Sequence, residues 1–257
     1  MNEQTAQVIS YGICNHAMIP VRSEPSHRAE LCTQLLFGET YHIHEIREGW
    51  TRICGSFDNY NGWIESKQTD IISQEEFQTC NQVFGIAHEI LFPVSFNNIS
   101  LLIPIGSSIP EINKYSYDGS HLPAGEMLDC DAICEMAKKF LHAPYLWGGR
   151  TPMGIDCSGL SQISYKLAGF RIPRDSFDQA GTGSTINLYS EAQPGDLVFF
   201  DNDEGKITHV GILLRENQII HASGKVRIDR IDHQGIFNEE TQSYTHKLRV
   251  IKRILEN

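Results

Sequence analysis

The spacing of apolar residues changes along the chain, and this change constrains the fold more than any other feature of the sequence. In the first half, apolar and polar residues alternate over short runs such as residues 41–46 and 50–54, which is typical of β-strands. Two stretches with the i, i+3, i+4 spacing of helices come next, and further strand-like runs follow them. Helices followed by strands, without β-α-β alternation, predict an α+β domain with an antiparallel sheet.

A cluster of Gly, Pro and Ser at residues 119–125 ends the first strand pattern and predicts a domain boundary. We expect a small antiparallel β-barrel domain with an extension over residues 1–123 and a second domain over residues 124–257. Residues 74–82 predict a short helix, and strands are expected at 84–96 and 100–105, separated by Asn97-Asn98. Two alternatives stay open for residues 74–122, which either complete the barrel or form a second, degenerate one.

In the second domain, Asp129 is predicted to cap a helix over residues 130–141, which ends before Pro144. A second helix is expected over residues 158–168, with Gly169 as its stop. The strand-like runs that follow are residues 197–200, 209–214, 218–222, 226–231 and 248–255.

Charge and cysteine content restrict the partners and the compartment. The formal net charge of −11 argues against a nucleic acid partner, and a cationic or small zwitterionic ligand fits better. The seven cysteines are an odd, scattered set without the spacing of a disulfide scaffold. The sequence has neither a signal-peptide pattern nor an apolar run long enough for a membrane span, so we expect a cytoplasmic protein with reduced thiols and no membrane partner.

Cys157 is the strongest candidate for a nucleophile. It lies in Asp156-Cys157-Ser158-Gly159, between the glycine-rich Trp147-Gly148-Gly149 and the predicted second helix. A thiol at a helix N-terminus experiences the positive end of the helix dipole and lies near unpaired backbone N–H groups. We therefore expect a stabilised thiolate with donors nearby for an oxyanion. The alternative is an ordinary buried thiol.

Two histidines on neighbouring strands are candidates for the base and its orienting partner. If residues 215–217 form a three-residue loop, Gly211 lies opposite His221. His209 is then a diagonal neighbour of His221 on the same face of the sheet, where two imidazoles can meet. We expect His209 to face Cys157 and His221 to hold its tautomer, although two strand histidines with ordinary packing would give the same pattern.

Six segments in order resemble the motifs of NlpC-type papain-like cysteine peptidases, which cleave cell-wall peptides. They are Pro144-Tyr145-Leu146-Trp147-Gly148-Gly149, Gly154-Ile155-Asp156-Cys157-Ser158-Gly159-Leu160, Arg174-Asp175-Ser176, residues 193–200, His209-Val210-Gly211-Ile212 and Ile220-His221-Ala222-Ser223. The resemblance implies a papain-like domain with a catalytic triad of Cys157, His209 and His221. It also implies that Tyr145 lies beside the reacting carbonyl, the alternative being a packed aromatic side chain.

The N-terminal half resembles the bacterial SH3-like domain of a narrower subgroup, the γ-D-glutamyl-L-diamino-acid endopeptidases. The similarity lies in residues 29–39 and 58–63. It implies that Glu30, Tyr60 and Asp156 bind the free amine of an N-terminal L-Ala, with Ser158, Arg174, Asp175 and Ser176 lining the same pocket. Glu39 is the rival to Glu30, and either is expected to pair with the ammonium group because an unpaired buried charge is costly.

The expected function is therefore hydrolysis of the γ-D-glutamyl-L-diamino-acid bond in murein peptides with a free N-terminal L-Ala, in cell-wall recycling. The alternatives are an amidase or acyltransferase on the same papain-like frame and a catalytically inactive wall-binding protein. We expect no cofactor. The pairs His42 with His44 and Cys130 with Cys134 each lack the further ligands that a zinc site needs, so no metal is expected either.

Overall fold

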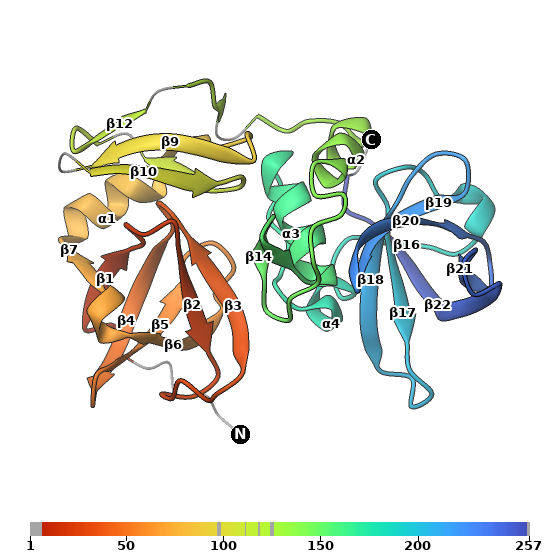
Figure 1. Cartoon of the computed structure of the whole chain (residues 1–257), viewed down its shortest axis with the longest axis horizontal. Coiled ribbons are helices and arrows are strands. Elements are labelled where there is room, and N and C mark those ends of the chain that lie inside the picture. The colour runs from red at the N-terminus through yellow and green to blue at the C-terminus, as the bar shows by residue number, and fades with distance from the viewer. Residues whose placement is uncertain (1–6, 97–98, 111, 118, 124–125, 256–257) are drawn as a thin grey trace. The chain divides into compact units, whose positions relative to one another are not determined.

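The computed structural model divides the chain into two compact units, Met1–Gly125 and Glu126–Asn257 (Figure 1). It describes residues 7–96, 99–110, 112–117, 119–123 and 126–255. The expected turn at Asn97-Asn98 and the first two residues of the expected second domain, 124 and 125, lie outside the described residues. Among the helices described, none has the length and apolar character needed to cross a membrane.

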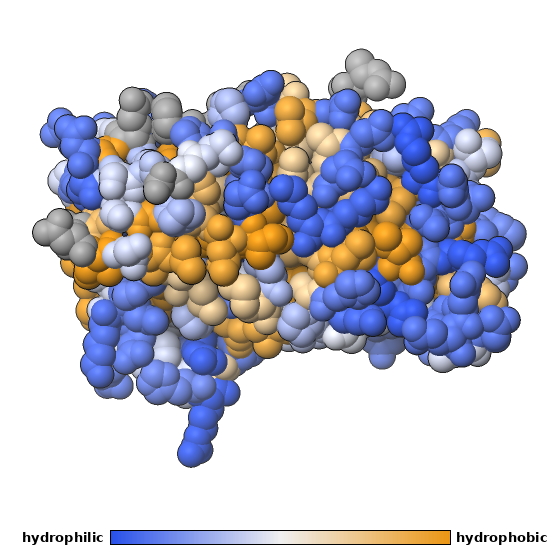
Figure 2. Space-filling model, turned by 45° about the horizontal axis from the view of Figure 1, so that its top comes forward, coloured by the Kyte–Doolittle hydropathy of each residue, from blue (hydrophilic) through white to orange (hydrophobic). Residues whose placement is uncertain are grey.

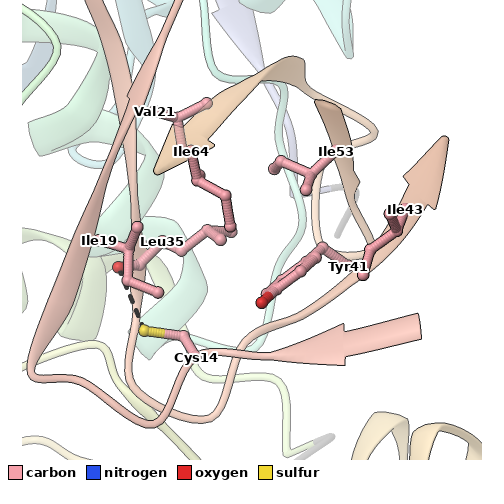
Figure 3. Close-up of a cluster of buried hydrophobic side chains, with 8 residues drawn as sticks. All are labelled: Cys14, Ile19, Val21, Leu35, Tyr41, Ile43, Ile53 and Ile64. Carbon is pink, nitrogen blue, oxygen red and sulfur yellow. Dashed lines mark hydrogen bonds between the residues drawn. The ribbon is translucent and has the colours of Figure 1, made fainter. Parts of the chain in front are cut away.

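The first unit contains a seven-stranded antiparallel sheet in the order β3-β2-β6-β5-β4-β1-β7. Its strands are Ser10–Ile13 (β1), Met18–Arg22 (β2), Leu31–Leu36 (β3), Thr40–Arg47 (β4), Trp50–Gly55 (β5), Asn61–Glu65 (β6) and Asp70–Ile72 (β7). The alternation that predicted β4 and β5 places Tyr41, Ile43 and Ile53 in the core, because successive side chains of a strand point to opposite faces. Figure 3 shows these three side chains converging with Cys14, Ile19, Val21, Leu35 and Ile64.

Residues 74–123 form a helix and two small sheets. Helix α1 (Gln74–Asn81) is confirmed, and Ser73 and Glu76 cap it reciprocally. The sheets have the orders β10-β9-β12 and β11-β8-β13 and share no strand with the seven-stranded sheet in the described part of the unit. Their strands are Val83–Ile86 (β8), Leu91–Phe96 (β9), Ile99–Pro104 (β10), Ser108–Pro110 (β11), Tyr115–Tyr117 (β12) and Leu122–Pro123 (β13).

The strand-like segment at residues 84–96 is divided between two strands, because β8 and β9 belong to different sheets. Ala87 lies between them, and its backbone bonds with a turn instead of with a neighbouring strand. The Ala87 N–H donates to the Ser107 carbonyl at 2.9 Å, and the Ala87 carbonyl accepts from the Gly106 N–H at 2.8 Å. Apolar periodicity does not record where a chain leaves one sheet for another.

The second unit packs helices against an antiparallel sheet, as the sequence predicted. Helix α2 (Cys130–Lys138) begins at Asp129, whose carboxylate accepts from the Ala132 N–H, and it ends earlier than expected. Helix α3 (Cys157–Leu167) is followed by Gly169 with a φ of +88°. The remaining elements before the main sheet are Arg150–Thr151 (β14), Gly154–Ile155 (β15), Ser176–Gln179 (α4) and Ser184–Ile186 (β16).

The main sheet of this unit closes on itself. Its order is β16-β22-β17-β18-β19-β20-β21, and β22 also pairs with β21. The strands are Leu197–Asp201 (β17), Ile207–Leu213 (β18), Gln218–Ser223 (β19), Lys225–Ile231 (β20), Gly235–Asn238 (β21) and Ser243–Arg253 (β22). The predicted final strand at 248–255 is shifted and too short, since the N-terminal part of β22 pairs with β21, a strand that the sequence did not predict. Strands β17 to β22 thereby form a closed ring.

The surface is mixed in polarity. The face shown in Figure 2 carries apolar patches between polar ones. In the segment before α3, the exposed apolar side chains include Leu146, Trp147 and Met153. Scattered exposed apolar residues are normal for a folded protein, so they need no special explanation.

We expect Ile53→Ala to lower the free energy of unfolding of the first unit by about 2–5 kcal/mol, because it leaves a cavity in the cluster of Figure 3. Ile46→Ala is the matched control: this isoleucine lies on β4 and is 51% exposed, so its loss should change stability by about 0.5 kcal/mol or less. Urea denaturation of both variants measures the difference. Equal effects would contradict the assigned core.

Candidate functional site

Cys157 is the first residue of α3, and the turn before it is held by the side chain of Asp156. The Asp156 carboxylate caps the helix by accepting from the Gly159 N–H at 2.7 Å. Cys157 itself is 7% exposed. Its sulfur lies within hydrogen-bonding reach of the backbone N–H groups of Ser158 and Val210. Val210 follows His209 on β18, so the sulfur faces the strand that carries the predicted base.

The capping aspartate is also half of a buried ion pair. Arg174 donates to both oxygens of Asp156, at 3.0 Å and 2.7 Å, and to the Ser158 hydroxyl at 2.8 Å. The Gly148 N–H donates to the same carboxylate at 2.7 Å. A bidentate arginine and backbone donors satisfy a buried carboxylate well, which makes this turn rigid. Three of the residues predicted to line the amine pocket therefore contact one another.

The register predicted for the two histidine strands is confirmed. Gly211 of β18 pairs with His221 of β19, and the Leu214 N–H donates to the Gln218 carbonyl at 2.8 Å across the three-residue loop. His209 Nε2 lies 2.8 Å from His221 Nδ1, and both rings are buried. The second nitrogen of His209, Nδ1, is thus the one left for the sulfur.

Asp229 on β20 extends this chain, and the sequence analysis missed it. His221 Nε2 lies 2.9 Å from Asp229 Oδ2, and Arg227 Nη2 donates to Asp229 Oδ1 at 2.8 Å. Arg227 pairs directly with His221, which places Asp229 one diagonal step further on the same face. The strand parity that places His209 beside His221 also places Asp229 on this face one strand further, so its position was predictable from the sequence.

His246 on β22 is a second residue that the sequence analysis missed. Its ring stacks on His209 with 4.3 Å between centroids and 26° between planes. On β17, Phe200 has its ring centroid 5.8 Å from that of His209. The contact between His246 and His209 depends on the pairing of distant strands, because β22 is joined to the sheet that carries the histidines by its pairings with β17 and β21. No local sequence pattern around His246 predicts this contact.

Burial sets the protonation of the reacting pair. It raises the pKa of Cys157 to about 12, with a further increase from the charge of Asp156 and opposing effects of the Val210 N–H and Arg174. The expected stabilised thiolate is therefore wrong for the free protein, because loss of hydration outweighs the helix dipole. Burial, then His221 and His246, lower the pKa of His209 well below 6.5. At neutral pH, Cys157 is therefore a thiol and His209 a neutral imidazole.

Tyr145 lies beside the same centre. Burial, followed by the charges of Cys157 and Asp156, raises its pKa to about 12, so its hydroxyl stays protonated at neutral pH. The Tyr145 N–H donates to the Gly224 carbonyl at 3.0 Å, and Tyr145 forms a bridge with Ile155 just before the nucleophile turn. A phenol held there is able to donate a hydrogen bond, whereas its role toward a carbonyl stays a prediction.

The remaining residues predicted to line the pocket in the second unit, Asp175 and Ser176, lie at the start of α4. Asp175 is the N-cap residue and Ser176 the first residue of this short helix, and both are partly exposed. Gln179 ties the helix to the nucleophile segment, donating to the Ser158 carbonyl at 3.0 Å and to the Pro173 carbonyl at 2.8 Å. Substrate contacts of Asp175 and Ser176 stay predictions.

In the first unit, Glu30 and Tyr60 lie at one end of the seven-stranded sheet. Glu30 precedes β3 and Tyr60 precedes β6, and both strands pair with Arg22 at the end of β2. Glu30 is exposed and Tyr60 partly exposed. Glu39 is buried in the turn after β3, where its carboxylate accepts from the Leu36 N–H at 2.9 Å. Of the two rivals, Glu39 therefore serves as a turn carboxylate.

Within the described residues, no group of three or more His, Cys, Asp or Glu side chains is arranged to hold a metal ion. Cys134 is buried in α2, where its sulfur lies 3.6 Å from the Leu213 carbonyl oxygen. His42 packs against Phe77 with 4.8 Å between ring centroids. Cys134 therefore packs in the interior of its unit, while His42 is partly exposed.

Comparison with known proteins bears on this arrangement. Residues 142–245, which include the cysteine, both bonded histidines and Asp229, match the model of the NlpC/P60 family. The chain carries an NlpC/P60 domain. Residues 21–68 of the first unit match the model of the bacterial dipeptidyl-peptidase SH3 domain, so this unit contains the expected SH3-like domain. The suspected family and the fold class are thus confirmed.

Curated relatives align with this chain over different lengths. A γ-D-glutamyl-L-lysine dipeptidyl-peptidase of Bacillus cereus is 26% identical over 246 residues, covering 82% of this chain and 73% of the relative. A protein named dipeptidyl-peptidase 6 from Lysinibacillus sphaericus is 24% identical, with 84% and 90% covered. The γ-D-glutamyl-L-lysine dipeptidyl-peptidase of Bacillus subtilis is 44% identical over 92 residues, which cover 35% of this chain and 31% of that protein.

A solved structure shows the same fold. The crystal structure of an NlpC/P60 family protein from Bacillus cereus superposes with a TM-score of 0.83 at 20% identity, covering 96% of this chain and all of that one. Together with the family models, these similarities support a cysteine peptidase that acts on peptidoglycan peptides. The NlpC/P60 domain supplies the thiol and imidazoles of this class, arranged as described above.

We expect alkylation of Cys157 by iodoacetamide to rise by about tenfold per pH unit from about pH 7 to about pH 9, because the thiolate is the reactive form and its pKa lies above that range. Peptide mass spectrometry at Cys157 measures the rate, and Cys157→Ala verifies the assigned peptide. A plateau below about pH 8 would contradict the neutral thiol and restore the thiolate.

Proposed function

We propose that the chain is a cysteine endopeptidase that hydrolyses the γ-D-glutamyl-L-diamino-acid bond of murein peptides with a free N-terminal L-Ala. The observation that carries this proposal is the contact of 2.8 Å between His209 and His221, with His209 on β18, the strand whose Val210 N–H lies near the Cys157 sulfur. The names of the Bacillus relatives support the bond that is cleaved.

Acylation begins with the neutral pair. As the Cys157 sulfur attacks the γ-glutamyl carbonyl carbon, its proton moves to Nδ1 of His209, and a C–S bond forms. The backbone N–H of Cys157, with Tyr145, is proposed to stabilise the oxyanion. His209 then transfers the proton to the departing amine as the C–N bond breaks, which leaves a thioester and the free diamino-acid fragment.

Deacylation uses the same groups in reverse. His209 takes a proton from a water molecule, whose oxygen attacks the thioester carbonyl. The C–S bond breaks, the Cys157 sulfur recovers the proton from His209, and L-Ala-γ-D-Glu is released. Protons are returned to their starting groups, so the cycle needs neither a cofactor nor a metal.

Selection for a free amine is proposed to rest on Glu30, Tyr60 and Asp156, with Ser158, Arg174, Asp175 and Ser176 around them. Arg174 already compensates the charge of Asp156. We propose Glu30 as a further carboxylate for the substrate ammonium, because a cation taken out of water needs an opposite charge nearby. Tyr60 would add a hydroxyl acceptor.

We also propose that the protein works in the cytoplasm, on fragments returned during cell-wall recycling. All seven cysteines, buried and partly exposed alike, are free thiols, which suits a reducing compartment. Cell fractionation with an antibody against the protein tests this location. Recovery in the culture medium or the wall fraction would contradict it.

We expect the protein to release L-Lys from L-Ala-γ-D-Glu-L-Lys, or diaminopimelate from the corresponding tripeptide, and Cys157→Ala to abolish release. Cys134→Ala is the matched control, since Cys134 is a buried thiol of the same unit that lies outside the mechanism. Mass spectrometry of the products measures both.

The N-acetylated tripeptide separates the two parts of the proposal. We expect its cleavage to fall by about 100-fold or more, because acetylation removes the charge that the carboxylate binds. Equal turnover of both peptides would contradict the amine pocket alone. Absence of cleavage of every tripeptide would contradict the proposed bond and favour an amidase or acyltransferase activity, or a wall-binding role.

A further inference from the structure

The chain of hydrogen bonds that leaves the catalytic imidazole does not end at His221. Beyond it lies Asp229, a buried carboxylate on the next strand, with Arg227 behind it. The family motifs that identified the cysteine and the two histidines include neither of these two residues. We propose that Asp229, held by Arg227, is a positioning residue that sets the tautomer of His221 and thereby aims the basic lone pair of His209 at Cys157. This inference rests on the proposed function.

Strand register places the three groups in one line. His221 pairs with Gly211, two residues from His209, and it pairs on its other side with Arg227, two residues from Asp229. Because side chains alternate with a period of two, each diagonal step stays on the same face. The resulting contacts are 2.8 Å between the imidazoles and 2.9 Å from His221 to Asp229.

The charge of Asp229 determines which nitrogen of His221 carries a proton. Burial raises the pKa of Asp229, but hydrogen bonds from His221 and Arg227 outweigh burial, and the net pKa is lowered. At neutral pH the group is a carboxylate, which only accepts hydrogen bonds. His221 must therefore carry a proton on Nε2, the nitrogen that faces Asp229.

The tautomer of His221 in turn determines the tautomer of His209. In neutral His221, a proton on Nε2 leaves a lone pair on Nδ1, which accepts from Nε2–H of His209. Neutral His209 with its proton on Nε2 has its lone pair on Nδ1, the nitrogen that the sulfur needs. When His209 takes up the thiol proton, the negative charge of Asp229 also stabilises the imidazolium through His221.

Arg227 fixes the carboxylate itself. Its guanidinium contacts both Asp229 oxygens, with Nη2 2.8 Å from Oδ1 and Nε 2.7 Å from Oδ2. Its further ion pair with Glu240, at 3.6 Å, involves a mostly exposed carboxylate and contributes little. His246 is a further titratable group against both histidines, with ring centroids 4.3 Å from His209 and 5.7 Å from His221, and it stays neutral because burial lowers its pKa to about 4.

A purely structural ion pair is the competing explanation, and Asp229→Asn separates the two. The asparagine amide can donate to His221 Nε2, which favours the other tautomer of His221 and leaves His209 with a proton on Nδ1. We expect kcat to fall by about 100-fold or more, with KM changed by less than about threefold. Asp229→Glu keeps the carboxylate and should recover most of the lost kcat.

Asp196→Asn is the matched control. Asp196 is a buried carboxylate of the same unit that forms a two-point ion pair with Arg253, at 2.9 Å and 2.8 Å, away from the histidines. It should lower stability to a similar degree while leaving kcat within about threefold of the wild-type value. Loss of kcat in Asp229→Asn no greater than in Asp196→Asn would overturn the proposal.

Nitrogen NMR of isotope-labelled histidine provides a test that needs no substrate. In the wild-type protein at neutral pH, we expect His221 and His209 both to be protonated on Nε2, and Asp229→Asn to move the His221 proton to Nδ1. Protonation of wild-type His221 on Nδ1 alone would overturn the proposal even if the variant does not fold. If the wild-type protein cleaves no tripeptide, the proposed function fails. The measured tautomers of His221 and His209 still test whether Asp229 sets them.

Discussion

The pairing register of β18, β19 and β20 is the constraint on which the site depends. His209, His221 and Asp229 come from three strands. They meet because His209 lies two residues from Gly211, the partner of His221 on β18, and Asp229 lies two residues from Arg227, the partner of His221 on β20. A slip of one residue would turn a ring to the opposite face of the sheet and break both hydrogen bonds. The three-residue loop between β18 and β19 fixes one pairing. Closure of the ring by β22 adds the stacked His246.

The nucleophile depends on a second constraint, the buried pairing of Asp156 with Arg174. This ion pair caps α3 and fixes the turn before Cys157, at the cost of placing a carboxylate next to the sulfur. The carboxylate and burial together hold the sulfur as a thiol, while burial of His209 keeps the imidazole neutral. Activation therefore requires proton transfer within the pair, and the orientation of the acceptor lone pair becomes decisive.

Local signals in the sequence predicted the parts that local chemistry determines. Asp129 caps the helix that was expected to follow it, and loop length together with strand parity predicted the contact between His209 and His221. The contact with His246 was not predictable in this way, because it depends on the pairing of β22 with β17 and β21. The thiolate expectation failed for another reason: a motif shows the helix dipole but not the depth of burial.

Trapping the acyl intermediate tests the central claim most directly, namely that Cys157 attacks the γ-glutamyl carbonyl with His209 as its base. The tripeptide is mixed with the protein, the reaction is quenched in acid within the first turnover, and the digested protein is analysed by mass spectrometry. We predict an L-Ala-γ-D-Glu thioester on Cys157 in the wild-type protein and none in His209→Gln. Product formation without an adduct on Cys157, or with an adduct on another residue, would contradict the account.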